Sequence, residues 1–182
     1  MTNDSNSLLP DVAGSMVRAL VLYSLAESQA GHAKTIRVTT DERSFSVSDD
    51  GRGHAISRLV AGSPYLKFVY SHLEYPFDPD EAPPVQLQGI GISLINALCS
   101  ELTVIVQKHD VTVRLSFQHG QPSDHETLAV TSPTTGNSVM GTLDAKLQMR
   151  AIDGESLRNW CRTILAVSPG LTMFYNDVKV SA

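Results

Sequence analysis

Polar and apolar residues alternate with two different periods along this 182-residue chain. Between Ser15 and Gly31 the apolar side chains recur every three or four positions, which predicts a helix with one buried stripe. Ser15 is a candidate N-cap for this helix and Gly31 a stop signal. Segments 34–40 and 44–48 alternate instead at every second position around the turn 41–43, which predicts two paired strands.

The rest of the chain repeats these two patterns. Helical spacing from Ile56 to Leu73 is interrupted near 62–64, and the proline-rich stretch 78–84 predicts a loop long enough to be a lid. Further helices are predicted at 91–100 and 156–167, and further strands at 102–108, 111–117, 127–132, 171–175 and 178–180. Because helices and strands are segregated, the order favours an α+β sandwich over a doubly wound sheet.

Length and composition agree with one domain over residues 1–182, in which 1–14 are flexible and 57–86 form a lid-like segment. Apolar residues make up 42% of the chain, which is enough for a sizeable core. The net charge of −5 and a pI near 5.6 give no basic footprint, so we predict no direct DNA binding.

Cysteine usage and hydropathy indicate the compartment. Cys99 and Cys161 lie in apolar patterns, which fits buried reduced thiols better than a disulfide framework. No long apolar segment and no basic, apolar leader is present, so we predict neither a membrane span nor a signal peptide. A cytoplasmic location is expected.

Two glycine-containing motifs are candidates for chemistry. The stretch "DDGRG" places Asp49 at the end of a strand before Gly51 and Gly53, where a carboxylate can face a cleft and accept from an amino group. On its own this motif is more typical of a plain turn. The stretch "QGIGIS" opens a helix with Gly89 and Gly91, whose free N–H groups could meet phosphate oxygens. It matches neither the Walker A nor the dinucleotide pattern, and tight packing explains it equally well.

The order of these motifs resembles a known family. Helix, hairpin, Asp-x-Gly-x-Gly, lid-length loop, Gly-x-Gly and helix resemble the ATP site of the GHKL superfamily. The stretches "AGHAKTIRVTT", "VSDDGRG", "GIGISLINALCSELTVIVQK" and "TLAVTSPTTG" are similar to the ATPase domain of the gyrase B subunit and its topoisomerase IV counterpart. The resemblance covers residues 17–136 and implies a two-layer sandwich with helices on one face of a mostly antiparallel mixed sheet.

Particular roles follow from the resemblance. Asp49 matches the carboxylate that binds the adenine amino group, with Gly51 and Gly53 behind it. Thr135 matches the first threonine of a "TGT" motif near the adenine, whereas Asn137 replaces the second threonine by an amide. We expect Asp49 at the floor of a cleft that is lined by Leu20, Ser24, Ile56, Val104 and Val139.

The resemblance also places the phosphates. The loop whose backbone would cradle them is made of Leu87, Gln88, Gly89, Ile90 and Gly91. Lys108 stands at the mouth of the pocket, where the family usually has an arginine. ATP or ADP is therefore the ligand that the resemblance implies.

The catalytic positions depart from the family. Its catalytic glutamate falls on Ala19, and its magnesium-binding asparagine falls on Tyr23, one helical turn later. These positions share a helix face, but the chemistry of the side chains is lost. Glu27 is the only acid of this helix and lies two turns too far along to replace the base. We expect no catalytic residue and no magnesium bound through the family's ligand.

Three functions remain open. The favoured hypothesis is a gyrase B-like module that binds nucleotide without hydrolysing it and acts as a sensor, a regulatory subunit or a decoy. The second is a divergent or truncated topoisomerase subunit that hydrolyses ATP with groups from a partner chain. The third is an interaction domain without a ligand, in which Asp49 caps a turn. The expected partners are a topoisomerase subunit or a second copy of the chain.

Overall fold

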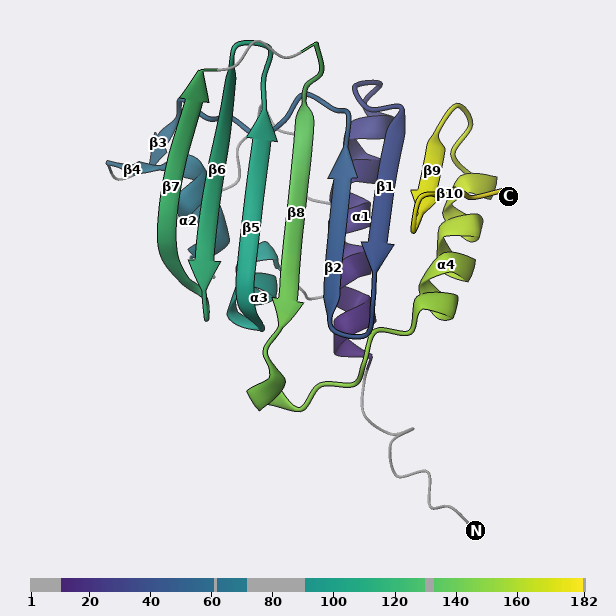
Figure 1. The fold of residues 1–182 in the computed structure, drawn as a ribbon. Coiled ribbons are helices and arrows are strands. Elements are labelled where there is room, and N and C mark those ends of the chain that lie inside the picture. Colours follow the sequence, from purple (N-terminus) through teal and green to yellow (C-terminus); the bar gives the residue numbers. More distant parts are fainter. Residues whose placement is uncertain (1–10, 61, 72–90, 130–132, 182) are drawn as a thin grey trace.

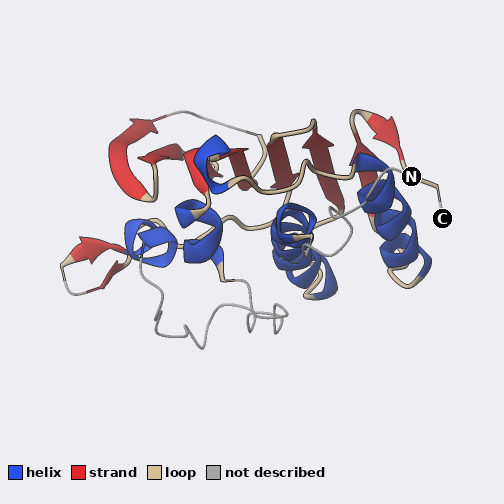
Figure 2. Cartoon of the chain, turned by 90° about the horizontal axis from the view of Figure 1, so that it is seen from below, coloured by secondary structure: helices blue, strands red, loops and turns tan. Residues whose placement is uncertain are grey.

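The computed structural model describes residues 11–60, 62–71, 91–129 and 133–181. In these residues an eight-stranded sheet forms one layer of the molecule, and helices cover one of its faces (Figures 1 and 2). This arrangement confirms the predicted two-layer α+β fold. Within the described ranges, no helix is long and apolar enough to cross a membrane.

The sheet is almost entirely antiparallel. From one edge to the other its strands are β10 (Val178–Lys179), β9 (Thr172–Tyr175), β1 (Thr35–Thr40), β2 (Ser44–Asp49), β8 (Gly136–Leu143), β5 (Cys99–Gln107), β6 (Val111–Gln118) and β7 (Gln121–Ala129). Only the β1–β9 pair is parallel among the pairs of this sheet in the described residues. The mixed, mostly antiparallel sheet is thus as predicted.

The helical layer contains α1 (Val12–Gln29), α2 (Tyr65–Ser71), α3 (Ile92–Ala97) and α4 (Gly154–Ala166), with a 3-10 turn η2 (Ala145–Leu147) at the end of β8. The predicted N-cap of α1 was wrong. Asp11 caps this helix by accepting from the Gly14 N–H, so Ser15 lies inside the first turn. The helix ends at Gln29, and Gly31 follows with a φ of 82°, as a stop signal requires.

Strand β8 was missed by the pattern of polar and apolar residues. Its sequence "GNSVMGTL" contains two glycines, which are unfavourable in strands. Gly141 is required by packing, because a Cβ there would lie 2.6 Å from the ring of Phe45. Because β8 packs closely against its neighbours, it contains glycine where the alternating apolar residues that predict a strand would otherwise stand.

Two other segments differ from the prediction. The first part of the helix predicted from Ile56 is a short hairpin of β3 (Leu59–Val60) and β4 (Ser63–Pro64), and helix begins only at Tyr65. Strand β7 begins at Gln121, well before the predicted 127. The prediction missed its first half because all nine residues are exposed, so no alternation of polar and apolar residues marks the strand. The loop 78–84 and most of the lid-like segment lie outside the described residues.

The core lies between α1 and the inner face of the sheet. Alternate residues of β1 and β2 are buried, so Ile36, Val38 and Val47 belong to the same core cluster as Val17 of α1. Both cysteines are free and buried, as predicted. Burial raises the pKa of the Cys99 thiol to about 12 and that of Cys161 to about 11, which keeps both protonated.

Candidate functional site

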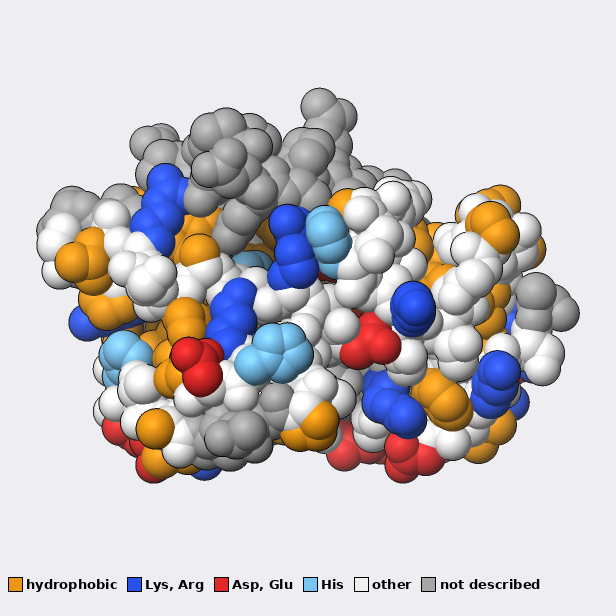
Figure 3. Space-filling view, turned by 90° about the horizontal axis from the view of Figure 1, so that it is seen from above, with side chains coloured by type: hydrophobic (Ala, Val, Ile, Leu, Met, Phe, Trp, Pro, Cys, Tyr) orange, Lys and Arg blue, Asp and Glu red, His pale blue; other side chains and the backbone are white. Residues whose placement is uncertain are grey.

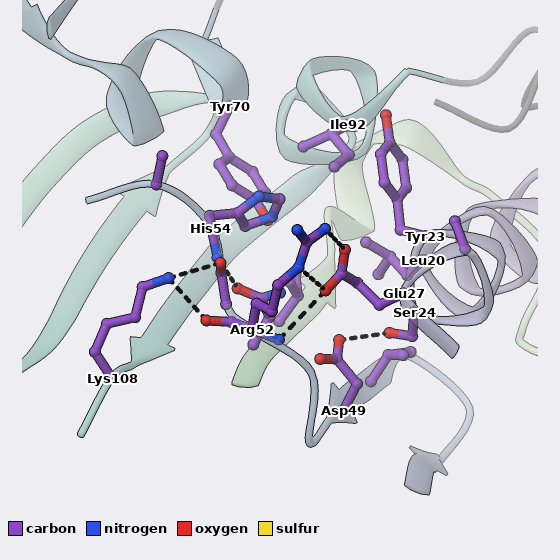
Figure 4. Close-up of a pocket in the computed structure, with 16 residues that line it drawn as sticks. Leu20, Tyr23, Ser24, Glu27, Asp49, Arg52, His54, Tyr70, Ile92 and Lys108 are labelled. Carbon is purple, nitrogen blue, oxygen red and sulfur yellow. Dashed lines mark hydrogen bonds and ion pairs between the residues drawn. The ribbon is translucent and has the colours of Figure 1, made fainter. Parts of the chain in front are cut away.

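A cavity of about 390 Å³ opens between α1 and the inner face of the sheet (Figure 4). Val47 of β2 is paired with Val139 of β8, and both side chains form its apolar floor. Asp49 lies two residues beyond Val47 and faces the same side of the sheet. The alternation of side chains along β2 therefore places the Asp49 carboxylate on the cavity side of the sheet, at the end of an apolar floor.

The Asp49 carboxylate is held by hydrogen bonds from two sides. Its Oδ2 accepts from the Ser24 hydroxyl of α1 at 2.8 Å, and its Oδ1 accepts from the Gly51 N–H at 3.0 Å. Burial raises the pKa of Asp49, and these hydrogen bonds only partly offset that effect. The group is thus a fixed acceptor whose charge is poorly solvated.

Two predicted site residues hold the loop after Asp49 in place by hydrogen bonds to its backbone carbonyls. Thr135 donates its hydroxyl to the Gly51 carbonyl at 2.6 Å, and Lys108 Nζ donates to the carbonyls of Arg52 at 2.7 Å and Gly53 at 2.8 Å. Lys108 also lines the cavity, whereas Thr135 lines a separate hollow of about 380 Å³. Both residues fix the loop, a role that the sequence did not suggest.

An ion pair missed by sequence reasoning forms one wall. Arg52 of the loop donates from NH2 to Glu27 Oε1 at 2.8 Å and from Nε to Oε2 at 3.1 Å. Burial raises the pKa of Glu27, but the hydrogen bonds and charge of Arg52 outweigh it and hold that pKa below its usual value. No sequence signal links residues 25 positions apart in this way.

The aromatic wall was also missed. The His54 and Tyr70 rings meet edge to face, with centroids 6.3 Å apart, and both line the cavity together with Ile92. Tyr70 belongs to α2 and Ile92 to α3, so two of the three residues of this wall come from segments far from Asp49 in sequence. Their presence makes the cavity wall more apolar than the motifs alone suggest.

The two family catalytic positions have different surroundings. Tyr23 lines the cavity, and its ring stands at the wall that α1 provides (Figure 4). Ala19 is only 4% exposed and packs in the core, outside the lining of this cavity. In the described part of the chain, no three His, Cys, Asp or Glu side chains gather as metal ligands do.

The other predicted lining residues divide into three groups. Leu20, Ser24 and Val139 line the cavity as predicted, and so does Asn137, which the resemblance places near the adenine. Ile56 and Val104 do not: Val104 is completely buried beside Val139 in the sheet, and Ile56 packs against the core. Of the predicted phosphate loop, Leu87, Gln88, Gly89 and Ile90 lie outside the described residues, and Gly91 is the N-cap of α3.

The end of the molecule at which β2 and β5 finish bears several Lys, Arg and His side chains (Figure 3). Arg52 and Lys108 belong to this end and reach the cavity. The chain as a whole is acidic, with a net charge of −5. Two basic side chains therefore border the cavity, and Arg52 is paired there with the Glu27 carboxylate.

The mostly antiparallel eight-stranded sheet with helices on one face is a GHKL-type two-layer fold. A topoisomerase IV ATP-binding domain of Francisella tularensis, solved with a small-molecule inhibitor, has a similar fold. The TM-score is 0.74 at 21% identity, covering 88% of this chain and 79% of that one.

The curated proteins that are similar to this chain in sequence include B subunits of DNA gyrase and DNA topoisomerase 4. The chain is 29% identical to the DNA gyrase B subunit of Campylobacter jejuni over 171 residues, and 28% identical to that of Mycobacterium tuberculosis; each match covers 91% of this chain. It is 29% identical to the DNA topoisomerase 4 B subunit of Pseudomonas aeruginosa over 89% of this chain. These matches cover 22%, 25% and 27% of the relatives, so the chain spans about a quarter of their length.

No protein-family model matches the chain. The predicted resemblance to gyrase B and topoisomerase IV B is nevertheless confirmed by the relatives and by the shared fold. The chain therefore has a GHKL-type fold and is related in sequence to the B subunits of DNA gyrase and topoisomerase IV.

Proposed function

We propose that this chain is a nucleotide-binding module that holds the adenine end of ATP or ADP against Asp49 and does not hydrolyse it. The observation that supports it most strongly is the Asp49 carboxylate, which Ser24 and Gly51 fix at the end of an apolar floor. A volume of about 390 Å³ is in the usual range for a small-molecule site. The solved structural neighbour is named as an ATP-binding domain, which agrees with this ligand.

The loss of hydrolysis is supported by the side chains on α1. The methyl group of Ala19 cannot accept a proton, and a neutral phenol such as Tyr23 is a poor ligand for magnesium, which prefers carboxylate and phosphate oxygens. Glu27 is the only acid of α1, and its pairing with Arg52 makes it a weak base. We therefore propose magnesium-independent binding dominated by the adenine half of the ligand.

The names of the relatives describe subunits, which supports a role beside a topoisomerase. We propose that the module senses nucleotide for such an enzyme or competes with its B subunit, without contacting DNA itself. Sedimentation of the chain alone, with a gyrase B subunit, and with DNA distinguishes self-association, partner binding and DNA binding.

Replacing Asp49 by Asn tests the site. The substitution keeps the shape of the side chain, since the amide oxygen can accept from Gly51 and the Ser24 hydroxyl can turn to accept from the amide nitrogen. The ligand's amino group would then face a donor instead of an acceptor. We expect Asp49→Asn to weaken ADP binding by about 1.5–3 kcal/mol, or roughly ten- to a hundredfold, in isothermal titration calorimetry.

Asp50→Asn is the matched control, because Asp50 is adjacent and accepts instead from the N–H groups of Lys34 and Thr35 outside the cavity. This variant should bind ADP like the wild type. The proposal is wrong if the wild type binds no adenine nucleotide, or if the two variants weaken binding equally. Tight binding that requires magnesium would contradict the proposed loss of the metal site.

A further inference from the structure

One face of the eight-stranded sheet, which we call the open face, carries no helix in the described part of the chain. Figure 1 looks onto this face, and helices α1, α2, α3 and α4 lie on the other side of the sheet (Figure 2). Two hollows of about 380 Å³ and 350 Å³ are lined in large part by its side chains. The open face therefore has room for the side chains of a partner.

The centre of the open face is made of short side chains. Directly opposed residues of neighbouring strands project from the same face, so the strand register shows which residues share it. Hydroxyl side chains surround two apolar ones there, and these six residues are Ser46, Ser48, Thr103, Ser138, Ile105 and Met140. All six are partly exposed. Short side chains leave the centre flat, and a flat sheet can pack against another sheet at about 10 Å.

One end of the open face is positively charged. Lys179 of β10 is paired with Phe174 of β9, and Phe174 is paired with Arg37 of β1, so the three side chains share the open face. The Arg37 guanidinium lies 4.1 Å from the centroid of the Phe174 ring, which holds it in place. Among the open-face residues of β10, β9, β1 and β2, the charged side chains are these two cations.

The other end is negatively charged. Glu126 and Asp124 of β7 are paired with Arg114 and Ser116 of β6, and Glu101 of β5 lies on the same face. Three carboxylates thus accompany one guanidinium on the open-face side of β8, β5, β6 and β7. The two halves of the open face have opposite net charge, so each half is complementary to the other half of a second copy.

This charge pattern selects one arrangement of two copies. A two-fold axis parallel to the strands lays the β10 end of each copy over the β7 end of the other, whereas an axis across the strands brings like ends together. Lys179 and Glu126 lie in one row of the ladder, on the two outermost strands. With the axis parallel to the strands, Lys179 of one copy faces Glu126 of the other, and this pair occurs twice.

The open face is also large enough for a dimer. Six of the eight strands in the described residues have six residues or more. With strands about 4.8 Å apart and a rise of about 3.3 Å per residue, these six strands cover roughly 600 Å² in projection. The relief of the side chains adds to this area, and a standard interface buries about 800 Å² per partner. The size is therefore that of a modest, specific interface.

We propose that the open face is a homodimer interface, on which a second copy of this chain docks sheet against sheet about an axis parallel to the strands. This inference goes beyond the proposed nucleotide site, because the open face lies on the other side of the sheet and needs no nucleotide. An interface rich in hydroxyl groups, with apolar side chains only at its centre, is typical of reversible association. The dimer should therefore dissociate on dilution.

Sedimentation velocity of the wild type tests the dimer directly. From about 1 µM to about 1 mM, the range of weak association, the mass should rise from 19.7 kDa toward twice that value. Salt at about 1 M screens exposed charges. Two exposed ion pairs should then contribute nothing, and we expect the dissociation constant to rise roughly two- to thirtyfold.

Reversing one charge at a time tests the orientation. Lys179→Glu and Glu126→Lys each place like charges opposite each other twice, so each variant alone should dimerise at least tenfold more weakly than the wild type. An equimolar mixture of the two variants restores two attractive pairs and should form a heterodimer. Lys67→Glu is the matched control, because it reverses an exposed charge on α2 in the helical layer and should dimerise like the wild type.

A substitution at the centre tests the contact itself. Met140→Lys places a charge where the two sheets meet, and we expect it to abolish the dimer. Val167→Lys makes a similar change just after α4, where the side chain is 76% exposed, and should leave the dimer intact. Urea unfolding of each variant shows whether the chain is still folded.

Each outcome decides the proposal. A wild type that stays at 19.7 kDa over the whole range overturns it, and so does a dimer that neither Lys179→Glu nor Met140→Lys weakens. A mixture of the two charge variants that does not associate overturns the axis parallel to the strands. If the wild type alone is monomeric but Met140→Lys abolishes its binding to a gyrase B subunit, the open face binds that subunit and the homodimer is wrong.

Discussion

At the scale of single residues, the motif around Asp49 could be predicted because it is local. Strand period, strand end and glycine spacing all lie within a few positions, so the sequence alone places this acid on the inner face of the sheet. The partners of the acid could not be predicted in the same way. Glu27 and Arg52 meet only because α1 lies over the end of β2, and that contact depends on the whole sandwich.

The raised pKa of Asp49 predicts a particular dependence of stability on pH. Because the folded chain holds the proton more tightly than the unfolded chain, the Asp49 contribution lowers the free energy of unfolding as pH rises from the unfolded pKa of 3.8 past the folded one. Asp49→Asn removes this charge. We expect the variant to gain stability relative to the wild type between about pH 3 and about pH 7, measured by urea unfolding.

The pKa of Asp41 is shifted in the opposite direction, so Asp41 should have the opposite effect on how stability depends on pH. Its pKa is lowered by hydrogen bonds from the Ser44 hydroxyl and from the N–H groups of Arg43 and Ser44. Its contribution is therefore fully present above 3.8 and is lost as pH falls through the folded pKa. Asp41→Asn should therefore lose stability relative to the wild type as pH rises from below the folded pKa to about 3.8, and the difference should stay constant above that pH. If both variants respond to pH with the same sign, the assignment of the Asp49 shift is incorrect.

At the scale of elements, helices α1 and α4 and the first hairpin followed from periodicity, whereas β8 did not. Helix α1 and strands β1 and β2 each have one buried side, and a buried side leaves a periodic trace. Strand β8 lies in the interior of the sheet and meets its neighbours so closely that glycine replaces the residues that usually mark a strand. Packing against residues that are distant in sequence determines that this segment is a strand, and a local sequence pattern contains no information about that packing.

Gly136, at the start of β8, allows a sharp prediction about this packing. Its φ is 146°, and a Cβ there would lie 1.9 Å from the Asp49 carbonyl oxygen, so the backbone would have to move. We expect Gly136→Ala to cost about 3 kcal/mol in the free energy of unfolding. The displaced strand should also weaken ADP binding, because Asp49 and Asn137 flank the contact.

Gly170→Ala separates steric conflict from backbone preference. Gly170 also has a positive φ, 85°, but a Cβ there would meet nothing within 4 Å. This variant should therefore lose only about 1 kcal/mol, the cost of a left-handed alanine, and should bind ADP normally. Equal losses in the two variants would show that the close approach of β8 to Asp49 has no energetic importance.

At the scale of the whole molecule, the cavity exists because the two layers bring distant segments together. Leu20 and Tyr23 come from α1, Tyr70 from α2, Ile92 from α3 and Val139 from β8. The fold and the Asp49 carboxylate are both present in this arrangement, while Ala19 and Tyr23 stand at the positions that the resemblance assigns to a base and a metal ligand. Under the proposed function, nucleotide binding depends on Asp49 and hydrolysis on the positions of Ala19 and Tyr23, so we expect binding without hydrolysis.

This separation predicts that the chain releases no phosphate from ATP above background, even with magnesium and saturating nucleotide. General-base catalysis typically contributes roughly 10²- to 10⁴-fold in rate, and a metal ion adds its electrostatic stabilisation of the transferred group. Neither Ala19 nor Tyr23 can supply these effects. Phosphate release should be measured for the wild type and for Asp49→Asn, since a contaminating ATPase would be indifferent to that substitution.

The double variant Ala19→Glu with Tyr23→Asn tests the reason for the loss. It restores an acid and an amide one helical turn apart on α1, so ADP and ATP binding should become stronger in magnesium than in EDTA. Because Ala19 is only 4% exposed, the new acid must compete with core packing, and we expect lower stability and at most trace turnover. Robust phosphate release by the wild type, abolished by Asp49→Asn, would instead mean that the chain hydrolyses ATP with another base.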